Sequence, residues 1–84
     1  MWCIDVAPSA VRALERAQLV DQMRVEAALI GMQVNPFAGD IRRLVGRERR
    51  WRRRVGNWRI IFTVNQMKGL VSIEMIVRRS STTY

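Results

Sequence analysis

The sequence contains no histidine, and Cys3 is its single cysteine. The absence of histidine excludes a Ser-His-Asp or Cys-His nucleophilic site and a histidine general base. One cysteine and scattered carboxylates provide no cluster of ligands, so we expect no metal site and no cofactor. Cys3 cannot form an internal disulfide. We interpret it as a small buried hydrophobic residue with a reduced thiol, which predicts a cytoplasmic protein.

Long apolar runs and phosphate-binding loops are also missing. No segment approaches the roughly 18 consecutive apolar residues that a membrane span needs. Residues 1–5 do not show a basic segment followed by an apolar one, so we expect no signal peptide. No glycine-rich phosphate loop is present. With 84 residues, of which 49% are hydrophobic, we expect residues 1–84 to form a single domain with one small core.

Basic residues are abundant and unevenly distributed, with a net charge of +8. Residues 1–40 contain three arginines and five carboxylates, whereas residues 41–84 contain twelve basic residues and two carboxylates. A basic half of this density implies a polyanionic partner. Nucleic acid is the first candidate and an acidic protein the second. An anionic membrane surface is the third, but the sequence lacks the amphipathic basic helix that would support it, so we expect no membrane partner.

The densest basic segment is residues 47–59, which holds seven arginines interleaved with Trp51 and Trp58. Arginine forks bind phosphates, and exposed aromatic faces stack on bases. A solvated basic loop is the alternative interpretation. However, the alternation of Trp51, Arg53 and Val55 with the arginines between them is typical of a strand. We therefore expect an ordered basic surface.

The remaining pattern predicts an α+β fold. A short strand at residues 2–6 precedes a helix that begins at Pro8, and a second helix is expected at about residues 21–33. The apolar stripe of this second helix is predicted to contain Met23, Ala27, Ile30 and Val34. After an anchor segment with Ile41 and Leu44, strands are expected at residues 51–55, 58–64 and 69–77. The N-terminal strand, the helical hairpin and the three-stranded antiparallel meander should form one twisted sheet with both helices on one face.

Alternation gives the predicted strands two sides, because residues two apart on a strand share a face. The side facing the helices is expected to contain Trp51, Val55, Ile60, Phe62, Val64, Val71, Ile73, Met75 and Val77. The opposite side is expected to contain Arg52, Arg54, Arg59, Ile61, Thr63, Ser72, Glu74, Ile76 and Arg78.

Four arginines are therefore expected to converge on a concave surface. Glu74 is the only carboxylate expected there, and we interpret it as the charge partner of an arginine rather than as a catalytic group. Arg53 is in phase with the core, so we expect it to lie beyond the core edge and to extend its guanidinium to solvent. The converging arginines are Arg52, Arg54, Arg59 and Arg78.

Arginines combined with Tyr84 suit the attack of an RNA 2′-hydroxyl on the adjacent phosphate. The nucleophile belongs to the substrate, and fixed positive charge stabilises the dianionic phosphorane. The products would be a 2′,3′-cyclic phosphate and a 5′-hydroxyl. Proton transfer is the demanding step, because arginine is a poor general base and a tyrosine would need help from the surrounding positive charge.

These residues resemble the RelE/ParE toxin superfamily of bacterial type II toxin–antitoxin systems. The resemblance covers the chain from Trp2 to Tyr84 and rests on the layout L-x-G, W-R-x-R-V-G-N-W-R-I-I-F-x-V, an apolar strand and R-x5-Y. The RelE branch cleaves messenger RNA in the ribosomal A site with basic residues on the concave sheet face and a C-terminal tyrosine. The resemblance therefore implies a metal-independent endoribonuclease, an mRNA interferase, whose partners are the ribosome and mRNA.

The resemblance also implies roles for individual residues. Arg52 or Arg54 would act as base or charge stabiliser, where lysines are usual in the family. Arg59 would contact the scissile phosphate, Arg78 would act near the leaving group, and Tyr84 would stack on or orient a nucleotide. Further arginines are expected to bind RNA: Arg47, Arg49, Arg50, Arg53 and Arg79.

Two other functions remain open at this stage. The ParE branch shares the fold but inhibits DNA gyrase without cleaving RNA, and only Arg78 and Tyr84 favour the RelE side. A small basic nucleic-acid-binding or protein-binding module without toxin activity is the third candidate. Either toxin implies a cognate antitoxin, expected to be acidic and to fold over the basic sheet face or the helices.

Overall fold

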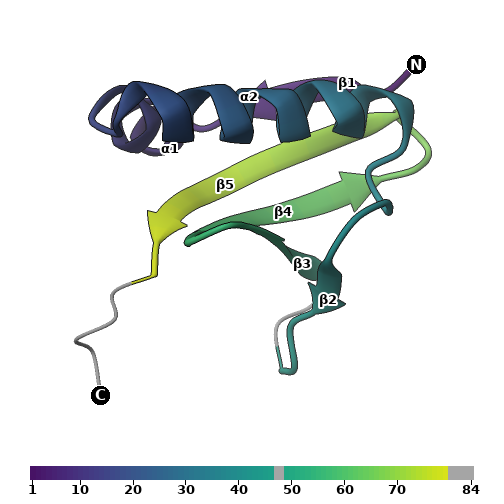
Figure 1. Ribbon diagram of the computed structural model, residues 1–84. Coiled ribbons are helices and arrows are strands. Elements are labelled where there is room, and N and C mark those ends of the chain that lie inside the picture. Colours follow the sequence, from purple (N-terminus) through teal and green to yellow (C-terminus); the bar gives the residue numbers. More distant parts are fainter. Residues whose placement is uncertain (47–48, 80–84) are drawn as a thin grey trace.

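The computed structural model describes residues 1–46 and 49–79 of the chain. Two helices pack on one face of a five-stranded sheet, so the predicted α+β class is confirmed (Figure 1). In chain order the elements are β1 (Cys3–Val6), α1 (Pro8–Glu15), α2 (Leu19–Val34), β2 (Ile41–Arg43), β3 (Arg50–Val55), β4 (Trp58–Asn65) and β5 (Leu70–Arg78).

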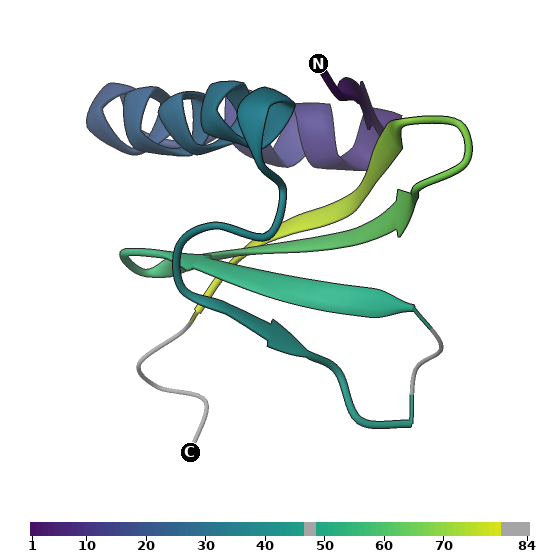
Figure 2. The ribbon, with the colours of Figure 1, turned by 90° about the vertical axis from the view of Figure 1, so that its right-hand side faces the viewer.

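The sheet has the strand order β1-β5-β4-β3-β2. β1 runs parallel to β5, whereas the other neighbouring strands are antiparallel. Figure 2 shows the sheet beneath both helices, with β2 and β3 farthest from them. β2 was not expected, because only its anchor residue Ile41 was identified. Its three residues are too few to show an alternation, and its place is set by pairing with residues 51–53 of β3.

Proline chemistry accounts for the start of α1 and the end of α2. Pro8 occupies the first turn of α1, where its missing N–H costs no hydrogen bond. α2 begins at Leu19, two residues earlier than expected, and the Gln22 amide donates a hydrogen bond of 2.8 Å to the Ala17 carbonyl at the corner between the helices. The helix stops before Asn35, since the residue before Pro36 disfavours the helical conformation.

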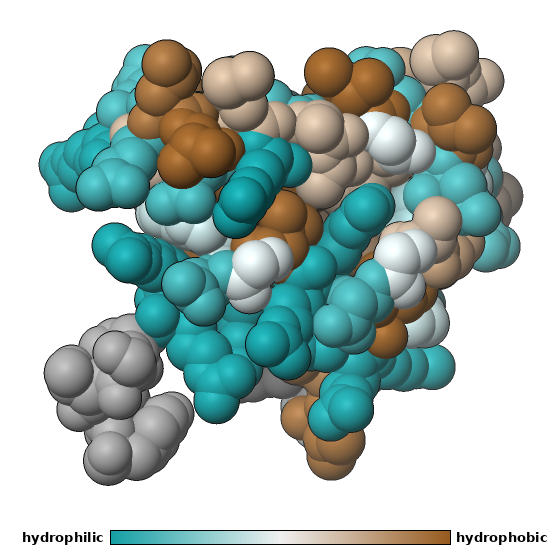
Figure 3. Space-filling view, in the orientation of Figure 1, coloured by the Kyte–Doolittle hydropathy of each residue, from teal (hydrophilic) through white to brown (hydrophobic). Residues whose placement is uncertain are grey.

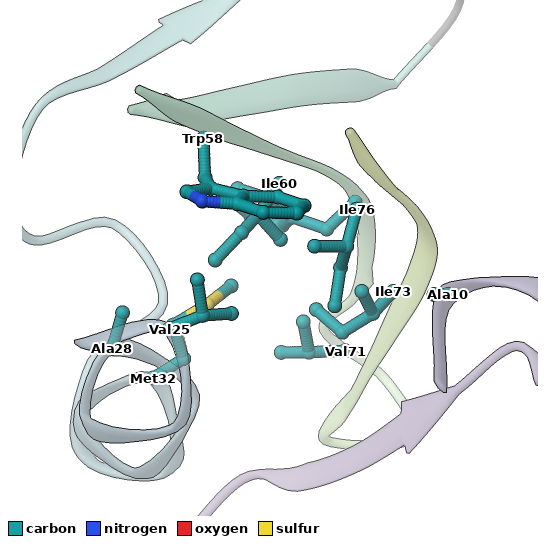
Figure 4. Close-up of a cluster of buried hydrophobic side chains, with 10 residues drawn as sticks. Ala10, Val25, Ala28, Met32, Trp58, Ile60, Val71, Ile73 and Ile76 are labelled. Atoms are coloured by element: carbon teal, nitrogen blue, oxygen red, sulfur yellow. The ribbon is translucent and has the colours of Figure 1, made fainter. Parts of the chain in front are cut away.

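The core lies between α2 and the central strands β4 and β5 (Figure 4). Met32 and Val25 of α2 belong to the same buried cluster as Ile60 and Phe62 of β4, which alternate with outward-facing residues as predicted. Each such side chain contributes about 1.5–3 kcal/mol when it is fully buried. The remaining buried apolar residues are Ala10, Ala28, Trp58, Val71, Ile73 and Ile76.

The predicted buried stripe of α2 is wrong. Ile30 is 64% and Val34 72% exposed, and Met23 and Ala27 also face solvent. The core-facing residues are instead Val25, Ala28 and Met32. α2 is apolar on both sides, so helical periodicity alone could not decide which stripe faces the sheet. Within the described ranges, no helix is both long and apolar enough to cross a membrane.

A β-bulge corrects the predicted faces of β5. Ile61 pairs with Met75 but Phe62 pairs with Ile73, so Glu74 is an extra residue on β5. The bulge shifts the alternation by one residue. Ile76 is consequently buried at 2% exposure, whereas Met75 and Val77 are exposed, the reverse of the expectation.

Cys3 is exposed, which corrects its expected burial. β1 is an edge strand in which Ile4 and Val6 are half-buried against the core while Cys3 and Asp5 face away from it. The alternation of the strand, rather than the apolar character of the thiol, therefore decides its position.

Candidate functional site

The sheet face opposite the helices carries five arginines, and we call this surface the basic face. Strand pairing defines it, because directly paired residues of neighbouring strands point to the same side. Ile60 and Phe62 are buried beneath the helices, so Arg59 and Ile61 point away from them. The residues of β3 that pair with outward-facing residues of β4, and the residue of β2 that pairs with Arg52, lie on the same side. The basic face thus contains Arg42, Arg50, Arg52, Arg54 and Arg59.

The sequence-predicted residues Arg52, Arg54 and Arg59 are brought together as expected. Arg52 and Arg54 lie two residues apart on β3, and Arg54 pairs directly with Arg59 on β4. Side chains in such a pair start about 5 Å apart, and like charges directly opposite each other are destabilising. A phosphate placed between the two guanidinium groups would remove this repulsion, so the pair indicates an anion-binding site.

Arg52 is held more tightly than its neighbours. Its side chain is only 13% exposed, and its Nη2 atom lies 3.5 Å from Asp40 Oδ1. The Nε atoms of Arg52 and Arg59 are buried and have no acceptor among the described residues. Buried donors without an acceptor are costly, so these two Nε atoms indicate that the basic face is not arranged for stability alone.

Two carboxylates flank the basic face, although only Glu74 was expected there. Glu74 Oε1 forms an ion pair with Arg50 Nε at 2.9 Å, which confirms its interpretation as a charge partner. Asp40 was missed. The Arg54 N–H donates to the Asp40 carbonyl at 2.9 Å, so Asp40 continues the ladder of β2 opposite Arg54. Arg42 was also missed, because the unexpected strand β2 places it beside Arg52.

The strand register does not place Arg78 on the basic face, so the expected convergence of Arg78 with the other arginines is wrong. Arg59 pairs with Val77, whereas Arg78 pairs with the buried Trp58 and so starts from the helix side at the end of β5. The bulge at Glu74 is the cause, since without it Arg78 would have had the opposite phase. The catalytic role of Arg78 remains a prediction.

The other predicted RNA-binding arginines are dispersed. Arg53 is on the core side as expected and extends past the core to Gly39, where an added Cβ would lie 3.0 Å from its Cζ atom. Arg49 is exposed before β3 with a φ of 58°. Arg79 is exposed, and its N–H donates to the Asn57 carbonyl at 2.7 Å. The predictions for Arg47 and Tyr84 fall outside the described residues.

The basic face can therefore bind and polarise a phosphodiester through fixed positive charge. Figure 3 shows hydrophilic atoms gathered over the strands below α2 and apolar atoms along the helix. No three metal-binding side chains gather within the part of the chain that the structure describes.

Comparisons with known proteins identify the fold. The sequence matches no protein-family model, and a search of curated proteins gives no significant match. Among solved structures, a chain of the archaeal RelE–RelB complex from Pyrococcus horikoshii is 20% identical with a TM-score of 0.84, covering 96% of this chain and 98% of that chain. The isolated RelE toxin of E. coli is 12% identical with a TM-score of 0.83, covering 99% and 89%.

A third solved structure agrees with these two. A chain of the toxin–antitoxin complex RelBE2 from Mycobacterium tuberculosis is 18% identical with a TM-score of 0.79, covering 93% of this chain and 98% of that chain. The similarity extends over nearly the whole length in all three comparisons. The chain therefore has the fold of RelE toxins, as the sequence resemblance implied.

Proposed function

We propose, from the RelE fold of the chain, that this protein is the toxin of a type II toxin–antitoxin system and a ribosome-dependent mRNA endonuclease. One observation carries the proposal: Arg54 and Arg59 face each other on the basic face, beside the buried and unsatisfied Nε donors of Arg52 and Arg59. Such a surface is suited to a phosphate whose negative charge increases during reaction.

The proposed reaction uses the substrate's own nucleophile. The 2′-oxygen attacks the adjacent phosphorus, the bond from phosphorus to the 5′-oxygen breaks, and the proton lost by the 2′-hydroxyl is balanced by one gained at the leaving oxygen. Arg59 would contact the scissile phosphate, with Arg52 and Arg54 as base or charge stabilisers. In the proposal Tyr84 orients a nucleotide and Arg78 acts near the leaving group. No metal or cofactor takes part.

The surface also supports a cognate antitoxin as partner. The P. horikoshii and M. tuberculosis structures are toxin–antitoxin complexes. Here the basic face offers positive charge to an acidic segment, and α2 exposes an apolar stripe. An amphipathic antitoxin helix on this stripe would shield it from water. The stripe consists of Leu19, Val20, Met23, Ile30 and Val34.

A purified translation reaction with a defined messenger tests the proposed activity. RNA ends would be mapped by primer extension with ribosomes, without ribosomes and with the variant Arg59→Ala. We expect cuts at A-site codons that require ribosomes and that decrease by about 100- to 1,000-fold in the variant.

Arg16→Ala is the matched control, because Arg16 is an exposed arginine at the end of α1, away from the basic face. It should cleave like the parent protein. Intact RNA under all conditions would contradict the nuclease, and a gyrase supercoiling assay would then test the ParE-type alternative.

A further inference from the structure

A hollow of about 680 Å³ lies at the end of the sheet where β4 ends and β3 begins. These two strand ends are on the right-hand side of Figure 2. Its volume falls within the roughly 300–1,000 Å³ of small-molecule sites. Among the described residues that line it there is no carboxylate, and its surface combines aromatic rings, two arginines and side-chain amides. The lining residues are Phe37, Arg43, Arg49, Trp51, Thr63, Val64, Asn65, Gln66 and Met67.

The aromatic part of this hollow is a fixed row of rings. Phe37 and Trp51 meet edge to face with 5.6 Å between ring centroids, and Trp2 supports Phe37 from behind at 6.3 Å. Such contacts hold both rings in place. Trp51 is half-buried and Phe37 is 36% exposed, so part of each ring faces the hollow. A fixed, partly exposed aromatic surface is what an unpaired nucleobase stacks on.

The polar part supplies donors for phosphate and base edges. The Cζ atom of Arg43 lies 6.0 Å from the centre of the Trp51 ring, and Arg49 is exposed beside it. Neither arginine forms an ion pair with a described carboxylate. The side-chain Oδ1 atom of Asn65 accepts a hydrogen bond from the Lys68 backbone N–H at 3.1 Å, which fixes the side-chain amide while its NH₂ group can still donate.

We propose that this hollow binds one unpaired nucleotide of an RNA strand whose neighbouring phosphates lie on the basic face. The base stacks on Trp51 and Phe37, and Arg43 and Arg49 hold its phosphate. The inference rests on the proposed function in taking RNA as the ligand. It adds a second contact point outside the site of cleavage.

The position of the hollow fits this extended path. Thr63 lines the hollow and also pairs with Arg50 of the basic face, so the hollow adjoins the basic face at the end of the sheet. Trp51 and Arg43 start from the helix side, because Trp51 pairs with the buried Phe62 and Arg43 pairs with Trp51, so the RNA strand would pass around this end of the sheet. Thr63 and Arg59 are four residues apart on β4, about 14 Å along the strand. This distance corresponds to about four stacked nucleotides. An octanucleotide is therefore long enough to occupy both surfaces.

Fluorescence anisotropy with a labelled octanucleotide tests the proposal. The RNA carries 2′-O-methyl groups, so it cannot be cleaved, and the full chain is used without ribosomes. We expect the double variant Arg43→Gln/Arg49→Gln to weaken binding about tenfold or more. Trp51→Leu should weaken it by about 5- to 150-fold, the contribution of one stacked base. Trp51→Phe, which keeps an aromatic face, should restore most of the loss.

The double variant Arg12→Gln/Arg16→Gln on α1 removes the same charge from exposed positions and should bind like the parent. Equal weakening in this control, unchanged binding in the hollow variants, or no measurable binding to the parent would overturn the proposal. A polyglutamate peptide provides a further check. If it competes with RNA for the parent protein but not for the variants of Trp51, Arg43 and Arg49, and these variants still bind RNA normally, the hollow binds an acidic protein instead. This result would also overturn the proposal.

The outcome is separable from that of the cleavage test. If no RNA is cleaved with ribosomes but the variants of the hollow bind the octanucleotide more weakly than the parent, the proposed nuclease activity is contradicted and the proposed nucleotide site is still supported. If Trp51→Leu does not fold by circular dichroism, the surface double variant Arg43→Gln/Arg49→Gln still decides the matter.

Discussion

Arg54 and Arg59 oppose each other across β3 and β4 with no carboxylate between them in the strand register. A sheet optimised only for stability would place opposite charges or β-branched residues in this pair. In the proposed function, this repulsion is the expected cost of a site that attracts a dianionic phosphate. Function and stability should therefore respond in opposite directions to changes at this pair.

We predict that Arg54→Thr raises the free energy of unfolding by about 0.2–1 kcal/mol, because it removes the like-charge pair and adds a residue suited to strands. The same variant should cleave RNA less efficiently. Urea denaturation and the primer-extension assay measure the two effects. A variant that is both less stable and fully active would contradict this interpretation of the pair.

At the level of elements, α2 has two apolar sides and only one faces the core. Met32→Ala should lower the free energy of unfolding by about 2–5 kcal/mol, because it opens a cavity among fully buried side chains. Ile30→Asn should change it by no more than about 0.5 kcal/mol, since Ile30 is exposed. Urea denaturation distinguishes this orientation from the one expected from sequence, which predicts the reverse order.

The same Ile30→Asn variant examines the proposed docking of an antitoxin helix. It should reduce co-purification of the cognate antitoxin while circular dichroism remains unchanged. Val45→Asn is the control, because Val45 is also an exposed apolar residue but lies after β2, outside α2, the basic face and the hollow, and this variant should retain the partner. If the antitoxin co-purifies with the Ile30→Asn protein as well as with the parent, the apolar stripe of α2 is not part of the antitoxin interface.

The strands show how far sequence patterns reach. Alternation in residues 51–64 predicted β3 and β4 and brought Arg52, Arg54 and Arg59 to one face. It failed on β5, because a single extra residue at Glu74 reverses the phase and no local signal marks that bulge. β2 was missed because its position depends on pairing rather than on its own three residues. Arg42 and Asp40 could therefore be placed only from the structure.

At the scale of the whole molecule, positive charge is concentrated in the segment that forms β2 to β5. This separation predicts a strong dependence of RNA binding on salt, because each neutralised phosphate releases counterions. For an uncleavable single-stranded RNA, log K should fall by about 0.7 per phosphate contact for each unit of log salt concentration. Removing two contacts in Arg54→Thr/Arg59→Gln should reduce the slope by about 1.4.

Titrations at several salt concentrations measure this slope. The α1 double variant Arg12→Gln/Arg16→Gln should keep the parent value, because these arginines lie on the helical side. An identical slope in the basic-face variant and the parent would show that Arg54 and Arg59 do not contact phosphates.

The parallel pairing of β1 with β5 also sets the time at which the protein can assemble during its own synthesis. Cys3 is aligned with Leu70, so the first strand waits for a partner that is translated more than sixty residues later. β5 also supplies Val71, Ile73 and Ile76 to the core. A nascent chain that has not yet released β5 from the exit tunnel has neither a complete sheet nor a closed core. The ribosome that makes this protein is therefore not exposed to its folded form until β5 has emerged.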